Sequence, residues 1–148
     1  MTTSSFTVAV NSQSLSRSAR GQITGIVYAE IDGMPFPERQ WSDSVVAVLS
    51  SWLESLNGLV TGASDSASLR FMDGPFRLDV KRGANGVHVY AVDSRRHEVA
   101  VSEMDTELEV IRSSTIRAAS QLLWECSARS WWSPDIDRLV HLANHAEA

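Results

Sequence analysis

Residues 76–92 carry the pattern that most restricts the fold, because apolar and polar side chains alternate ahead of a strong turn signal. Alternation of this kind is typical of a strand with one buried and one polar face. Asn85-Gly86 then favours a tight hairpin turn, and residues 87–92 supply an apolar return strand. The segment therefore predicts an antiparallel β-hairpin. The alternating residues before the turn are Phe76, Arg77, Leu78, Asp79, Val80 and Lys81.

Other segments extend this hairpin into a mixed fold. Further strands are predicted over residues 6–11, 22–31, 68–72 and 97–103, whereas the serine-rich residues 12–21 are predicted to form a loop. Strands and helices follow one another in the order β-β-α-β-β-β-β-α-α. Because the two kinds of element are largely segregated along the chain, the sequence predicts an α+β fold. One antiparallel sheet of about six strands would pack against the helices.

Three helices are predicted from apolar stripes and capping signals. The first is predicted to end at Asn57-Gly58, because glycine commonly follows the last turn of a helix. The second is predicted to begin at Thr106, which has the spacing of a capping box with Glu109. The third is predicted to begin at Ser133-Pro134, with serine as the cap and proline in the first turn. The apolar stripe of the first helix comprises Val45, Val46, Val48, Leu49, Trp52, Leu53 and Leu56.

Length and charge limit the classes of partner. The 148 residues predict one domain, 1–148, that buries its own core. The net charge of -5 argues against nucleic-acid binding, which usually uses a basic patch, and it suits a basic protein partner. The sequence has no signal-peptide pattern and no apolar run of roughly 18 residues, which a membrane helix needs. We therefore expect a cytoplasmic protein without a membrane partner.

The sequence predicts no catalytic, metal-binding or cofactor-binding residues. Cys126, the one cysteine, falls on the apolar stripe of the second helix, where a buried and inert thiol is expected. His141 and His145 have a spacing that zinc sites use, but Leu142 stands where an H-E-x-x-H motif has its glutamate. These histidines are expected on the surface. The chain is therefore expected not to be an enzyme and to need no cofactor.

Five carboxylates gather where the last predicted strand leads into the second helix. Acidic residues at a helix start stabilise it through the helix dipole, which is a sufficient structural reason for some of them. An acidic surface of this density also suits a basic protein partner. We therefore treat the group as candidate partner-binding residues. They are Glu98, Glu103, Asp105, Glu107 and Glu109.

Trp131 and Trp132 are the second group of candidate partner-binding residues. They lie between the last two predicted helices, and the chain has five tryptophans in all. Tryptophan is enriched at binding hot spots because it buries a large area with few rotatable bonds. Packing of the helical corner explains the pair as well, and a further hypothesis is self-association through these two residues.

Three segments of the chain resemble a known family. They are MPFPERQWSD at residues 34–43, VLSSW at 48–52 and FMDGPF at 71–76. Together they resemble bacterial immunity proteins encoded beside polymorphic toxins, including those of contact-dependent growth inhibition systems. In that family an FP…W.D segment leads into a tryptophan-bearing helix, and a strand and an F-M-D-G-P-aromatic turn follow. The resemblance covers roughly residues 22–125.

The resemblance implies a non-enzymatic inhibitor that binds a toxin domain. Many such toxins are basic nucleases, and a phosphate-binding groove complements an acidic inhibitor. It also implies that the shared motifs hold the fold: Phe36, Trp41 and Trp52 would cluster at the start of the first helix, and Gly74 would permit the turn before Pro75. No binding residues follow from the resemblance, because immunity proteins vary where they contact their own toxin.

A small-molecule-binding domain or minor enzyme is the alternative hypothesis. Its site would lie between the sheet and the second helix. Arg70, Arg77, Asp79 and His88 are expected to share a polar sheet face, although a solvated face explains them too. An open pocket with convergent polar groups would favour this hypothesis, and a closed sheet–helix interface would count against it.

Overall fold

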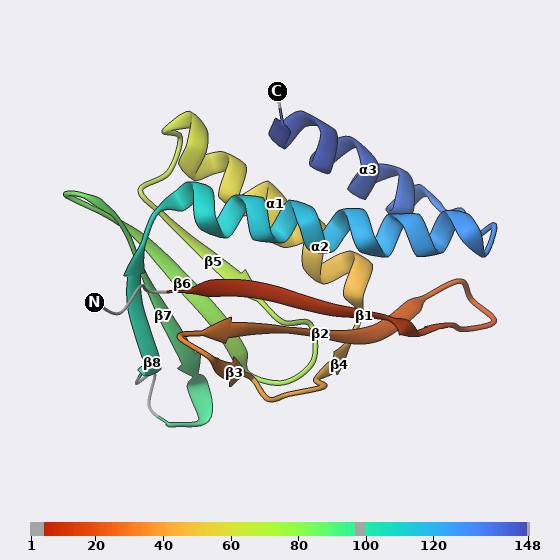
Figure 1. Cartoon of the computed structure of the whole chain (residues 1–148), viewed down its shortest axis with the longest axis horizontal. Helices are drawn as coiled ribbons and strands as arrows, with labels where there is room; N and C mark the ends of the chain where they lie inside the picture. The colour runs from red at the N-terminus through yellow and green to blue at the C-terminus, as the bar shows by residue number, and fades with distance from the viewer. Residues whose placement is uncertain (1–4, 97–99, 148) are drawn as a thin grey trace.

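Two antiparallel sheets and three α-helices make up the fold (Figure 1). The computed structural model describes residues 5–96 and 100–147. Sheet A has the order β1-β2-β3 with β4 also paired to β2, and sheet B has the order β5-β6-β7-β8. The predicted α+β class is confirmed, with the strands divided between two sheets of four rather than gathered in one. The elements are β1 (Phe6–Arg17), β2 (Ile23–Ile31), β3 (Met34–Phe36), β4 (Ser42–Asp43), α1 (Val45–Thr61), β5 (Ser66–Arg70), β6 (Phe76–Gly83), β7 (Gly86–Asp93), a 3₁₀ turn (Ser94–Arg96), β8 (Ala100–Thr106), α2 (Leu108–Ala128) and α3 (Pro134–Glu147).

Sheet B confirms the predicted antiparallel meander. β6 and β7 form the hairpin, and Gly83 pairs with Gly86 at its end. Gly86 has a φ of +136°, and a Cβ there would lie 2.6 Å from the carbonyl oxygen of Thr106. Only glycine fits this turn without moving β8.

Strand β1 is longer than the sequence predicts, because the expected loop over residues 12–21 largely belongs to it. The pairing with β2 shifts register between Asn11 and Ser16, so β1 bulges there. The Ser14 hydroxyl donates to the carbonyl oxygen of Asn11 (2.6 Å) and accepts from the backbone N–H of Ile26 (2.9 Å). A serine side chain thus replaces part of the backbone ladder. A polar, serine-rich segment of this kind has low strand propensity, so the sequence predicts a loop there.

Helix α1 is the centre of the core. Its apolar stripe is buried as predicted, and it packs against β2, β5, α2 and α3. The helix continues past the predicted stop at Asn57-Gly58 and ends at Thr61, with Gly62 in the left-handed conformation. The extra turn buries Leu59 completely. Burial of this leucine outweighs the cost of about 1 kcal/mol for a glycine inside a helix.

The motifs of residues 34–43 and 71–76 meet in one aromatic cluster. Phe36 makes edge contacts with Phe71 and Phe76, at ring-centroid distances of 6.1 and 5.7 Å. Trp41 contacts Phe76 at 5.1 Å, and Trp52 contacts Phe71 at 5.2 Å. Edge contacts of this kind add to the stabilisation from buried area. Phe36, Trp41 and Trp52 therefore belong to one cluster, which Phe71 and Phe76 join together. Trp52 enters it from the middle of α1 and not from the predicted start of the helix.

One buried carboxylate joins the same two motifs. Asp43 is 4% exposed. It accepts hydrogen bonds from the indole N–H of Trp41 and from the backbone N–H groups of Met72 and Asp73, each at 3.1 Å, and from that of Ser44 at 2.6 Å. Asp43 thereby ties the start of α1 to the turn between β5 and β6.

The two later helices differ in how they begin. The predicted capping box of Thr106 and Glu109 is wrong: Glu107 is the N-cap of α2 and makes no side-chain capping bond. Thr106 is held in β8, where it pairs with Val87. For α3 the predicted cap is confirmed, since the hydroxyl of Ser133 accepts from the N–H of Ile136 at 3.1 Å.

Cys126 is expected to resist alkylation in the folded protein. It is buried on α2, as the sequence predicts, and burial raises the pKa of its thiol. Since the thiolate is the nucleophile, we expect iodoacetamide to modify it at least about 100-fold more slowly in the folded protein than in urea. Because the pKa of this thiol is raised by folding, its contribution to stability is fully present at pH values below the pKa of the unfolded chain. That contribution is lost as the pH rises through the higher pKa of the folded protein. Equal alkylation rates in both states would contradict this placement.

Candidate functional site

The acidic residues of the sequence prediction gather along one edge of the molecule. β8 is the outer strand of sheet B, and α2 follows it directly. Glu103, Asp105, Glu107 and Glu109 are all exposed, with the side chain of Asp105 at 86%. We call these four residues the acidic edge. Glu98 lies outside the described residues.

Few positive groups offset the acidic edge. His88 of β7 lies between two of its carboxylates, contacting Asp105 through Nδ1 and lying 3.7 Å from Glu103 through Nε2. Arg112 binds Glu109 at 3.1 Å, one turn further along α2. The side chains of His88 and Arg112 are largely buried, whereas those of Glu103, Asp105 and Glu109 are 57%, 86% and 67% exposed. These carboxylates therefore stay accessible to a partner.

The tryptophan pair lies far from the acidic edge. The ring of Trp131 sits between the guanidinium groups of Arg17 and Arg129, at 5.5 and 4.9 Å, and Arg129 also donates to the carbonyl oxygen of Leu15 at 2.9 Å. Trp132 is 69% exposed. The two groups flank opposite ends of α2 (Figure 1), which at ~1.5 Å per residue is about 30 Å long. The predicted binding residues therefore form two separate patches.

The polar face of sheet B groups the residues of the alternative hypothesis. Arg70 pairs with Arg77, and Asp79 and His88 lie on the same face of β6 and β7. Arg77 binds Asp79 through Nε at 3.0 Å, and their side chains are only 18% and 20% exposed. The ring of His88 stacks on Tyr90 at 4.4 Å. The prediction that these four residues share a face is confirmed. Within it Arg77 and Asp79 pair with each other, whereas His88 contacts Tyr90 and Asp105 and Arg70 is exposed.

A groove between sheet A and α2 opens beside an exposed tryptophan. It has a volume of about 710 Å³, and Trp124 of α2, at 74% exposure, forms one wall. Val10 and Tyr28 form the other wall, so the sheet–helix interface is not closed along its whole length. Its surface offers aromatic rings, hydroxyls and amides. Sequence reasoning does not reveal this groove.

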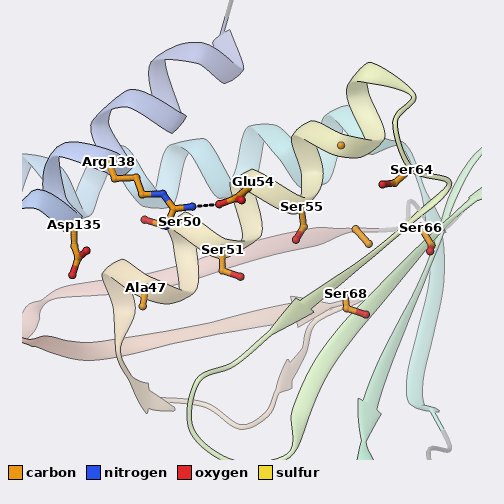
Figure 2. Close-up of a pocket in the computed structure, with 12 residues that line it drawn as sticks. Ala47, Ser50, Ser51, Glu54, Ser55, Ser64, Ser66, Ser68, Asp135 and Arg138 are labelled. Atoms are coloured by element: carbon orange, nitrogen blue, oxygen red, sulfur yellow. Dashed lines mark hydrogen bonds and ion pairs between the residues drawn. The ribbon is translucent and has the colours of Figure 1, made fainter.

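A second groove, lined by serines, lies between α1, β5 and the start of α3 (Figure 2). Its volume is about 640 Å³. An ion pair between Arg138 and Glu54 crosses one end. Sequence reasoning missed this groove, although small residues recur along one side of α1. The serines that line it are Ser50, Ser51, Ser55, Ser64, Ser66 and Ser68.

The described residues form neither a metal-binding cluster nor a membrane-spanning helix. Across residues 5–96 and 100–147, no three His, Cys, Asp or Glu side chains come together in a way that could hold a metal ion. In the same part of the chain, no helix is long and apolar enough to span a membrane. No family model, curated protein or solved structure matches the chain.

Proposed function

We propose that this chain is an immunity protein, which binds a cognate toxin domain with a basic surface and neutralises it by protein–protein contact. The observation that carries the proposal is the acidic edge, where four exposed carboxylates follow one another along β8 and the start of α2. A toxin that cleaves nucleic acid presents a basic surface to the phosphate backbone. An acidic protein surface complements such a groove in charge.

Apolar residues beside the acidic edge offer hydrophobic surface that a partner can bury, which the carboxylates do not. Charge complementarity mainly speeds association and selects the partner, whereas affinity comes from a few well-packed anchors. Val101 and Val110 are exposed next to the carboxylates, at 49% and 40%. Val101 also lines a groove of about 420 Å³ with Met34 and Trp41. We infer that the interface is centred on these exposed valines and bordered by the acidic edge.

We propose that binding occurs in the cytoplasm, where a free thiol such as Cys126 remains reduced. An inhibitor of this kind needs no chemistry of its own, because occupying the groove of the toxin prevents the substrate from entering. Self-association through Trp132 is a separate hypothesis and is not required.

Co-purification tests the proposal. The chain is expressed together with the C-terminal domain of a toxin encoded beside it, and only one of the two carries a tag. We expect both proteins to elute as a one-to-one complex and the toxin to lose its activity in that complex. If the toxin still kills cells that contain this protein and the two elute separately, the proposal is wrong.

A further inference from the structure

Strand β5 turns some of its backbone groups away from its partner strand. Two hydrogen bonds bracket the β5–β6 ladder: Arg82 N–H to the carbonyl of Asp65 at 2.9 Å, and Phe71 N–H to that of Phe76 at 3.1 Å. In an antiparallel pair, alternate residues face the partner. Residues 65, 67, 69 and 71 therefore face β6, and the backbone groups of Ser66, Ser68 and Arg70 point away. The carbonyl of Arg70 confirms this direction, because it accepts from the indole of Trp52 at 2.8 Å.

Ser66 and Ser68 consequently point their N–H and C=O groups into the serine-lined groove. β5 is an outer strand of sheet B. Two other outer strands carry features that discourage pairing: β8 bears the exposed carboxylates of the acidic edge, and the Ser114 hydroxyl accepts from the outward N–H of Val8 in β1 at 2.7 Å. Unprotected edges tend to pair with another chain. The stretch Ser66–Ser68 carries small neutral side chains, so nothing in it repels an added strand.

The facing wall of the groove leaves room for another backbone. Ala47, Ser51, Ser55 and Gly58 follow one side of α1 and line the groove. Figure 2 shows Ser51 and Ser55 on the side of α1 that faces β5. An exposed helix side usually carries long charged residues. Small residues instead permit close approach of a second chain.

Ser50 supplies an independent sign of a polar ligand. It is 5% exposed and lines the groove, and its hydroxyl makes no hydrogen bond to any described residue. A buried polar group without a partner is costly and calls for an explanation. The ion pair of Arg138 with Glu54 crosses the groove beside it, and both side chains are more than half exposed. Such a pair is weak enough for a ligand to displace.

We propose that the groove binds an extended peptide segment with small, uncharged side chains, which adds to β5 as a further strand. Its backbone would bond to the N–H and C=O groups of Ser66 and Ser68, and its polar side chains would reach the hydroxyls of Ser51 and Ser55. Displacement of the Arg138–Glu54 pair would open the buried hydroxyl of Ser50 to the same ligand. Strand addition of this kind takes its affinity from main-chain hydrogen bonds. At ~3.4 Å per residue, bonding to both serines needs a segment of about four residues. The inference does not depend on toxin binding at the acidic edge.

Two substitutions test the groove by different physical routes. Ser55→Arg fills it with a long side chain that is compatible with a helix. Ser68→Pro removes an outward N–H without breaking the ladder to β6. Ser120→Arg is the matched control, because it places the same side chain on an exposed position of α2 in the groove beside Trp124. Thermal unfolding of each variant shows which of them remain folded.

The probes are octapeptides selected from a random phage-displayed library against the full chain and then synthesised. We expect selected peptides to be uncharged, to shift the amide resonances of Ser66 and Ser68, and to bind Ser55→Arg and Ser68→Pro at least about tenfold more weakly than the wild type. Peptides weakened by Ser120→Arg instead would overturn the proposal. So would failure to select any peptide that binds more tightly than about 1 mM. Self-association of the wild type that Ser55→Arg abolishes would make a second copy the occupant and would equally reject the proposal.

Discussion

Replacing Asp43 with alanine is expected to lower the free energy of unfolding by about 4 kcal/mol. The carboxylate is buried and receives four N–H donors, from Trp41, Ser44, Met72 and Asp73. Alanine leaves all four donors without an acceptor, and each buried orphan costs about 1–3 kcal/mol unless water reaches it. The loss would also separate the start of α1 from the turn between β5 and β6.

Urea denaturation of purified variants measures this effect. Asp73→Ala is the matched control, since it removes an exposed carboxylate from the adjacent turn and leaves the backbone N–H of Asp73 in place. We expect this control to change stability by less than about 0.5 kcal/mol. A loss below about 1 kcal/mol for Asp43→Ala would mean that water replaces the carboxylate and that this link does not hold the motifs together.

Much of the fold could be predicted because its signals are local. Alternation marks β6, the Asn85-Gly86 dipeptide marks the hairpin, and an apolar stripe marks α1. The cap of α3 by Ser133 is equally local. Each of these patterns is encoded by residues a few positions apart in the chain, and the tertiary contacts of the fold agree with it.

The missed features depend on contacts between distant segments. The bulged half of β1 is held by Arg129, which donates to the carbonyl of Leu15 from the far end of α2. Helix α1 continues through Gly58 because Leu59 fills the core. Thr106 cannot cap α2 because it is paired with β7. None of these partners is visible from the local pattern.

The same distinction applies to the candidate sites. The acidic edge could be predicted because its residues are close in sequence and lie on one strand end and the helix that follows. Trp132 belongs to a different patch because the length of α2 separates them. The serine-lined groove joins α1 to β5, and its local signal is the small-residue spacing of Ala47, Ser51 and Ser55.

Reversing two charges of the acidic edge is expected to weaken binding of a basic toxin domain by about 100-fold. The variant Asp105→Lys with Glu109→Lys places cations where the partner is also basic, so attraction becomes repulsion. Both residues are exposed, and stability should change little. For the wild type, raising the salt concentration should slow association, because exposed charges are screened.

The matched control is Asp65→Lys with Asp137→Lys. Both residues are exposed, on segments other than β8 and α2. This variant changes the net charge by the same amount as the reversal of the acidic edge. It therefore separates a local effect of the acidic edge from a general effect of charge.

The most direct measurement is the dissociation constant of the toxin domain for the wild type, the acidic-edge variant and the control, determined by titration calorimetry at one salt concentration. If the acidic edge borders the interface, the affinity of the Asp105→Lys, Glu109→Lys variant for the toxin domain falls about 100-fold. The affinity of the control stays within about threefold of the wild type. Equal weakening of both variants, or unchanged binding by the acidic-edge variant, would contradict the account.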